Sequence, residues 1–365
     1  MTGRVSSRLD RYQQRHPVLG FPIAVVYKFF DDQGAYLAAL VTYYGFLSIF
    51  PLLLLLTSVL GFVLGGDDSL RSQIQDSVFS QIPILDQTIG RTDISEGLRG
   101  SVPAVVIGFV VALYGAIGVA QAAQNAMNRV WGVPRNSRPN PFASRGKSLL
   151  LITVVGGGVV VTTALSTLIS NVDHLGFAMG TALTLVAYLV TIGGNFLIFW
   201  EGFRLATARD LQYRQLWPGA LFAAVGWWVL QRAGTYAAQH ELSRASAAYG
   251  VFGVVLGLLG FLFVGSILFV VSAELNVVRE RRLYPRSLLT PFTDAVVLTP
   301  ADQRAYGSYP EIERLKGFQQ VDVQFAPEHT SDQIPVLRRD AGLVRRPAEP
   351  PVADPDGPPP VRPTP

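Results

Sequence analysis

Residues Gln33–Gly66 read QGAYLAALVTYYGFLSIFPLLLLLTSVLGFVLGG, a run without a single charged side chain. A helix that crosses the roughly 30 Å hydrocarbon core of a bilayer needs about 20 apolar residues. Five more charge-free stretches follow: Ser101–Asn128, Ser148–Val172, Leu175–Trp200, Gln215–Gln231 and Ala245–Ala273. Only Gln215–Gln231, the fifth of the six, is shorter than this length. The sequence therefore predicts an all-α, polytopic membrane protein with six transmembrane helices.

The composition excludes several other classes of protein. Hydrophobic residues make up 49 % of the chain and charged residues only 15 %, unlike a typical soluble domain. The net charge of +4 comes without a basic stripe interleaved with aromatics, so we expect no nucleic-acid partner. The chain has no cysteine, and its four histidines lack metal-ligand spacing. We expect neither a metal nor a cofactor.

Basic residues alternate between the connections, and this predicts the orientation. Cytoplasmic loops are enriched in Lys and Arg. The connection between the first and second spans is rich in acids. The segments before the first span and after the second, fourth and sixth spans are basic instead. In that order, their basic residues are Arg4, Arg8, Arg11, Arg15 and Lys28; Arg129, Arg135, Arg138, Arg145 and Lys147; Arg204, Arg209 and Arg214; and Arg279, Arg281, Arg282 and Arg286. Both termini are expected in the cytoplasm.

The chain divides into three predicted parts. Residues 1–32 form a cytoplasmic segment with a short interfacial helix over 18–32, whose wet end carries Lys28, Asp31 and Asp32. A plain extension of the first span is the alternative. Residues 33–283 form the six-helix domain. Residues 284–365 form a polar tail with one exposed helix over 300–316, and its Pro-rich composition from Ala341 onward predicts that the tail is mostly disordered.

Amide side chains within the spans are candidate substrate-binding groups. Gln121, Asn125 and Asn128 lie near one helix face. They either provide hydrogen bonds between helices or line a cytoplasm-facing cavity. Asn195 follows Gly193-Gly194, where another helix could approach closely.

The first span adds Tyr43 and Pro51 to the candidate binding residues. A proline removes one backbone hydrogen bond and usually kinks its helix. Such a break either builds a binding site or only serves packing.

Charged side chains gather at the predicted cytoplasmic ends of three spans. Arg129 ends the second span, Glu201 and Arg204 end the fourth, and Glu274 ends the sixth. These four residues are expected at one level of the bundle. They either pair structurally, or lie there as ordinary interfacial charges, or bind substrate.

Five short motifs in this order resemble the BrkB/YihY family of bacterial inner-membrane proteins. They are AALVTYY with SIFP (38–44 and 48–51), NAMNRVWGV (125–133), PGA (218–220), AYG (248–250) and AELN (273–276). The resemblance covers about residues 25–283. It implies six membrane helices, both ends in the cytoplasm, an inner-membrane location and a link to envelope biology.

The family has also carried a ribonuclease label, which this sequence does not support. Metal-dependent hydrolysis of RNA needs clustered carboxylate or histidine ligands, and the HxHxDH pattern is absent. We expect no enzyme, although a membrane-embedded enzyme is a third, weaker hypothesis.

Two functional hypotheses remain open. The first is a transporter or exporter that moves a small solute or lipid through a cavity in the bundle. The second is a non-transporting envelope scaffold that recruits partners through its tail or outer loop. No ATP-binding motif occurs, so active transport would need a gradient or a separate ATPase. The lipid bilayer is the expected partner, and a homo-oligomer is compatible with either hypothesis.

Overall fold

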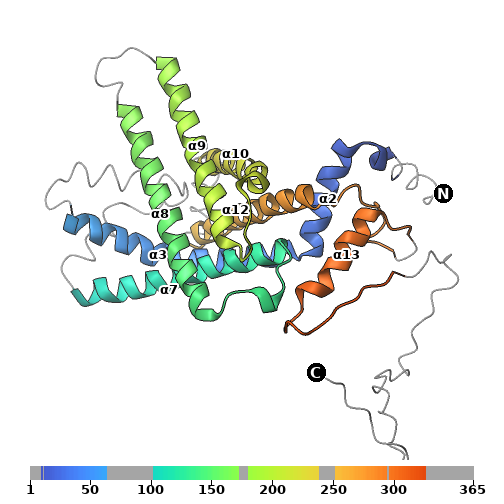
Figure 1. Cartoon of the computed structure of the whole chain (residues 1–365). Coiled ribbons are helices and arrows are strands. Elements are labelled where there is room, and N and C mark those ends of the chain that lie inside the picture. The colour runs from blue at the N-terminus through green and yellow to red at the C-terminus, as the bar shows by residue number, and fades with distance from the viewer. Residues whose placement is uncertain are drawn as a thin grey trace, which may run out of the picture. The chain divides into compact units, whose positions relative to one another are not determined.

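The computed structural model describes residue 10 and residues 12–63, 102–171, 180–237, 251–293 and 296–325, which are helical and contain no strand. In chain order the elements are α2 (Pro17–Asp31), α3 (Gly34–Val63), α7 (Val102–Val130), the short 3-10 helix η1 (Arg135–Ser137), α8 (Pro141–Asn171), α9 (Gly180–Ala206), α10 (Tyr213–Ala237), α12 (Val251–Glu280) and α13 (Pro300–Ile312) (Figure 1). The six long helices coincide with the six apolar stretches.

Four of these helices are long and apolar enough, over described residues, to cross a membrane. The candidate spans are Phe109–Val130, Pro141–Thr162, Leu185–Ala206 and Val255–Glu280. The apolar helix Gly34–Ile49 is shorter. The protein is thus an all-helical membrane protein over the residues described, while the count of six spans stays a prediction. The predicted acidic outer connection, residues 67–100, lies outside the described residues.

Helix α12 is the centre of the bundle. It packs against α2, α3, α7 and α10, while α3 runs beside α7 and α8 beside α9 (Figure 1). The protein buries 44 % of the candidate span in α7 but only 6 % of the candidate span in α9. Since apolar side chains left uncovered by protein face lipid in a membrane helix, α9 offers a broader lipid-facing surface than α7 among the described residues.

Close packing of α10 on α12 depends on one glycine. The amide of Gly219 donates a hydrogen bond to Asn276 Oδ1 at 2.7 Å. A Cβ at position 219 would collide with the carbonyl oxygen of Ser272 and with the Asn276 side chain. Glycine therefore allows the two backbones to approach, as small residues do at membrane-helix contacts.

The N-terminal helix is separate from the first long helix. Helix α2 ends at Asp31, and Gln33 takes a positive φ of 57°, which an α-helix does not allow. The structure thus matches the predicted short helix and not its alternative, an extension of the first span.

Part of the predicted tail is folded. Helix α13 ends at Ile312 rather than at residue 316, and one face, with Ala301, Asp302, Ala305 and Ile312, is buried, so the prediction of an exposed helix is wrong there. Residues up to Phe325 belong to the same compact unit as the helices. Residues 326–365, which include the Pro-rich segment, lie outside the described residues, and their disorder stays a prediction.

The Gly219→Ala substitution is expected to destabilise the protein by about 1–3 kcal/mol, because the added methyl group overpacks the α10–α12 contact. Thermal unfolding of the purified protein in detergent measures the change. Gly193→Ala is the matched control, because a Cβ there meets no atom within 4 Å. Alanine at that helical site should leave stability unchanged or raise it by up to about 1 kcal/mol. Equal effects of the two substitutions would contradict this account of the packing.

A candidate functional site at one end of the helix bundle

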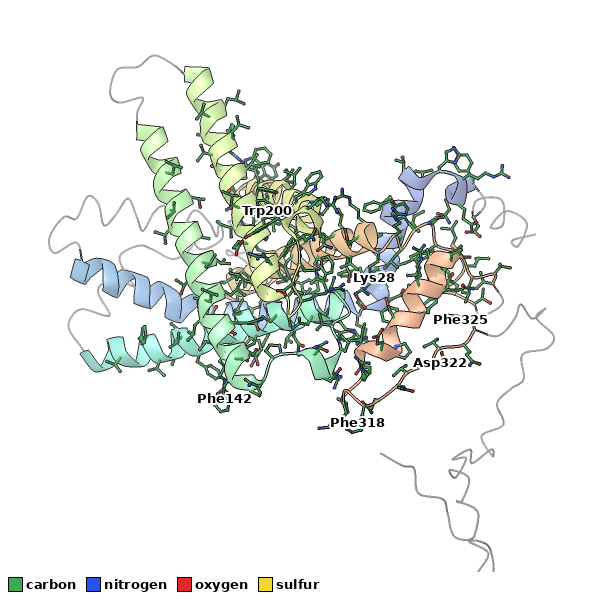
Figure 2. All side chains as sticks on the ribbon, in the orientation of Figure 1. Lys28, Phe142, Trp200, Phe318, Asp322 and Phe325 are labelled. Atoms are coloured by element: carbon green, nitrogen blue, oxygen red, sulfur yellow. The ribbon has the colours of Figure 1, made fainter. Side chains whose placement is uncertain are left out.

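Three ionisable side chains from two helices meet inside the protein. Lys28 Nζ forms an ion pair with Asp32 Oδ2 and lies 3.4 Å from Glu274 Oε2. The Lys28 side chain is 3 % exposed, and the two carboxylates are fully buried. We call Lys28, Asp32 and Glu274 the buried triad. Figure 2 places Lys28 where α2, α12 and α13 come together.

Local structure explains how the triad forms. Lys28 and Asp32 are four residues apart at the end of α2, so they lie on one face. Glu274 lies in the last two turns of α12, which packs on α2. Lys28 also donates a hydrogen bond to the carbonyl of Val130 at the end of α7, at 3.3 Å. The prediction of a wet end at Lys28, Asp31 and Asp32 is therefore wrong for Lys28 and Asp32, because α7 and α12 cover them, while Asp31 stays 19 % exposed.

The triad is electrostatically unusual. Burial alone would lower the pKa of Lys28, but the Glu274 and Asp32 carboxylates outweigh burial and hold this pKa above its usual range. Neither oxygen of Glu274 accepts a hydrogen bond from the described residues, nor does Oδ1 of Asp32. The buried hydroxyl of Tyr309 also lacks a partner there, and burial, with nearby carboxylates, raises its pKa. Such a group of charges is costly inside a helix bundle.

A chain of ion pairs leads from the triad to the surface. Arg129 at the end of α7 lies 3.9 Å from Asp32 Oδ1 and 2.7 Å from Glu313 Oε1. Arg135 pairs with the other oxygen of Glu313 at 2.8 Å. The triad is therefore connected electrostatically to the segment that follows α13.

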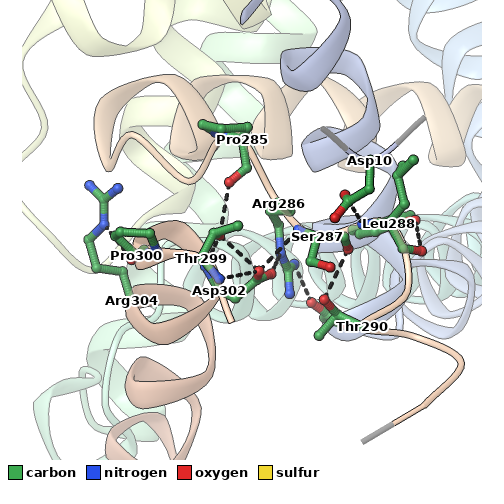
Figure 3. Close-up of polar contacts among 12 residues, drawn as sticks. Asp10, Pro285, Arg286, Ser287, Leu288, Thr290, Thr299, Pro300, Asp302 and Arg304 are labelled. Carbon is green, nitrogen blue, oxygen red and sulfur yellow. Dashed lines mark hydrogen bonds and ion pairs between the residues drawn. The ribbon is translucent and has the colours of Figure 1, made fainter. Parts of the chain in front are cut away.

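A second cluster fastens α13 beside the triad. Arg286 is buried between two carboxylates. It lies 2.9 Å from Asp302 Oδ1 (Figure 3) and 2.6 Å from Asp31 Oδ2. Burial would lower the pKa of Arg286, but Asp31 and Asp302 more than reverse this effect and raise it. Asp302 also accepts hydrogen bonds from Ser287 N at 3.0 Å and from Thr299, with which it forms a capping box. We call Arg286, Asp31 and Asp302 the clasp.

The predicted charge cluster is divided in the structure. Glu274 and Arg129 both lie at the triad. Glu201 and Arg204 pair with each other at 4.0 Å and share the hydroxyl of Tyr213, at 2.9 Å and 2.7 Å respectively. Figure 2 shows neighbouring Trp200 on α9, away from Lys28. The four residues thus contribute to two groups and not to one.

The predicted binding amides also occupy different environments. Asn128 is buried and accepts a hydrogen bond from the amide of Ala208 at 2.7 Å. Asn125 is exposed and accepts one from Arg138 at 3.1 Å. Gln121 and Asn195 are half-buried. Their role in binding stays a prediction.

The two candidates on the first span both lie within α3. The Tyr43 side chain is 57 % exposed and packs against the ring of Tyr44. Pro51 is included in the helix, which runs on to Val63. The proposed kink and binding role of Pro51 stay predictions.

Sequence reasoning missed most of the triad and the clasp. Lys28 and Asp32 have ion-pair spacing, which a solvated helix end would show equally well. The predicted start of α13 at residue 300 is correct, but the Thr-x-x-acid spacing of Thr299 and Asp302 could also have shown that Asp302 belongs to a capping box. No local sequence pattern indicates that Arg286 lies between Asp31 and Asp302, because Arg286 and Asp31 are 255 residues apart in the sequence.

No group of three or more His, Cys, Asp or Glu residues in the described ranges could hold a metal ion. Residues 25–294 match the family described as virulence factor BrkB. This range contains all three residues of the triad and nearly all of the bundle. The chain belongs to the BrkB family.

Two relatives of this BrkB-family protein are similar over most of its bundle. The inner membrane protein YhjD of Escherichia coli (strain K12) is 26 % identical over 266 residues, 68 % of this chain and 78 % of YhjD. An uncharacterised protein of Dickeya dadantii (strain 3937) is 27 % identical over 255 residues, 65 % and 76 % of the two chains. With its apolar helices, these matches identify a multi-pass protein of the inner membrane.

A third relative bears a different name. The ribonuclease-like protein YfkH of Bacillus subtilis (strain 168) is 21 % identical over 257 residues, 68 % of this chain and 91 % of YfkH. No solved structure matches the chain.

The Asp302→Asn substitution is expected to loosen α13. It removes the carboxylate charge from buried Arg286, and breaking a buried ion pair on one side costs about 3–5 kcal/mol. Trypsin should then cleave after Arg304, within α13, faster than in the unchanged protein. Asp322→Asn, at an exposed carboxylate, is the control for lost charge. Cleavage after Arg304 at the same rate in both variants would show that the clasp does not hold the helix.

Proposed function

We propose that this BrkB-family protein is a transporter or exporter of a small solute or a lipid, with six membrane-crossing helices and both termini in the cytoplasm. The membrane location and the family support this reading, as do the arginine-rich ends of α7, α9 and α12. The observation that carries the proposal is the buried triad, an ionisable group enclosed at one end of a membrane helix bundle.

The chemistry of the triad favours a working role over a purely structural one. Buried charges in membrane bundles are costly and mark substrate or ion pathways more often than packing contacts. A buried ion pair that only holds helices together can often be replaced by apolar residues without loss of stability. Here Glu274 keeps its charge partner but has no hydrogen-bond donor among the described residues. In our proposal the triad is a gate that closes the cytoplasmic end of the bundle.

The path to this gate would run along α12. Thr42 of α3 donates a hydrogen bond to Ser266 of α12 at 3.0 Å, and both side chains are buried. Ser266 lies two helical turns before Glu274 on the same helix, on the membrane side of the gate. Opening the triad would therefore expose Ser266 to water from the cytoplasm.

A non-transporting scaffold is the second candidate, and interior packing favours it. Gln124 hydrogen-bonds to Ser148 at 2.9 Å and joins α7 to α8, while Asn276 joins α12 to α10. These bonds satisfy polar groups directly between helices, as expected for a packed interior. In this alternative the tail or the outer loop would recruit envelope partners. In both proposals the protein is not an enzyme.

Cysteine labelling tests the gate, because the chain has no native cysteine. In inverted membrane vesicles, Ser266→Cys should react slowly with a membrane-impermeant maleimide while the triad is intact. Adding Glu274→Gln removes the contact of Lys28 with α12 and leaves only its pair with Asp32 on its own segment. The labelling rate should rise by about tenfold, which corresponds to about 1.4 kcal/mol in the closed state.

Two controls keep this experiment decisive. Glu280→Gln has the same charge change on α12 at an exposed site, and it should not alter the labelling rate. Ser137→Cys, exposed after α7, reports which side of the vesicle the reagent reaches. Protection of Ser266→Cys from both sides in every variant would contradict a gated pathway and favour the scaffold.

A further inference from the structure

A basic pocket lies apart from the triad, where α8 begins and α9 ends. It encloses about 320 Å³. Helix α8 contributes Lys147 and Leu150, helix α9 contributes Arg204 and Leu205, and residues 207–211 between α9 and α10 complete the wall. This volume is at the lower end of the range for small-molecule sites.

The pocket carries more positive charge than the protein neutralises. Three basic side chains, Lys147, Arg204 and Arg209, face one carboxylate, Asp210. Arg204 is held by Glu201 and by Tyr213, on whose ring it stacks at 4.5 Å. Neither Lys147 nor Arg209 has an ion-pair partner within the described part of the chain. Burial and the nearby charge of Arg209 together lower the pKa of Arg281, so the positive field of Arg209 reaches the end of α12.

The depth of the pocket matches the headgroup layer of a bilayer. Lys147 lies near the start of the candidate span Pro141–Thr162, and Arg204 near the end of Leu185–Ala206. One turn farther into the span, Leu150 is half exposed, so an apolar wall continues from the basic residues toward the hydrocarbon core. Phe142, 81 % exposed on the same helix (Figure 2), adds an uncovered apolar side chain at this end of α8.

We propose that this pocket binds the phosphate of an anionic phospholipid headgroup, with Lys147 and Arg209 supplying the charge and Arg204 held in place by Tyr213. Basic pockets between membrane helices are suited to anionic headgroups. Leu150 and Leu205 offer the apolar contact that a free phosphate would not use. This assignment is independent of whether the protein transports anything.

Lipid binding to the purified, delipidated full chain tests the site. Native mass spectrometry measures the affinity for phosphatidylglycerol and for zwitterionic phosphatidylcholine. The unchanged protein should prefer phosphatidylglycerol. The double substitution Lys147→Gln with Arg209→Gln should weaken that binding by about 30-fold, as expected for the loss of two basic residues near an anionic headgroup.

The matched control is Arg145→Gln with Arg214→Gln, which removes two exposed charges from the same region without touching the pocket wall. It should change the affinity less than threefold, roughly the effect of distant exposed charges. An equal loss in both double variants, or equal binding of the two lipids, would overturn the proposal. Displacement of the lipid by an equal concentration of glycerol phosphate would assign the site to a soluble phosphate instead and would overturn the lipid part.

Discussion

The enclosure of one lysine with two carboxylates between α2 and α12 is the constraint on which the rest of this end of the bundle depends. Lys28 cannot leave the interior without removing the ammonium partner of Glu274 and leaving Asp32 with Arg129 alone, at 3.9 Å. Helix α2 is therefore held against α12, and the end of α7 is held with it, because the Val130 carbonyl accepts from the same ammonium group. Breaking a buried pair on one side costs about 3–5 kcal/mol, a sizeable fraction of the usual net stability of a folded protein.

The clasp extends this constraint to α13. Asp31 and Asp32 are adjacent at the end of α2. Asp31 pairs with Arg286, and Asp32 pairs with Lys28. Helix α13 starts at Pro300, and Asp302 in its first turn forms the capping box with Thr299 and contacts Arg286 at the same time. One short helix terminus thus orders both the interior charges and the segment after α12, which explains why residues 284–325 fold with the bundle.

The long helices were predictable, whereas the charged contacts between them were not. Helix positions follow from the absence of charge over stretches such as Gln33–Gly66, since a bilayer selects length and apolar composition more strongly than any local propensity. The site depends on tertiary contacts. Lys28 follows an apolar run and has the pattern of a lysine that reaches back to water. Only the packing of α12 and α13 over it reverses that expectation. Asn128 was recognisable as a buried polar residue, but its partner, the amide of Ala208, belongs to a loop that sequence patterns do not place.

A double-mutant cycle on Lys28 and Glu274 tests this account most directly. The free energies of unfolding of Lys28→Met, Glu274→Leu and the double variant would be compared with the unchanged protein in mixed detergent micelles. Lys28→Met leaves two buried carboxylates without their ammonium partner, whereas Glu274→Leu leaves the Lys28–Asp32 ion pair. The double substitution removes one charge of each sign, and Asp32 keeps Arg129 at 3.9 Å. The account predicts that the double variant is less destabilised than the sum of the single variants, with a coupling energy of about 1–3 kcal/mol. Additivity within about 0.5 kcal/mol would contradict it.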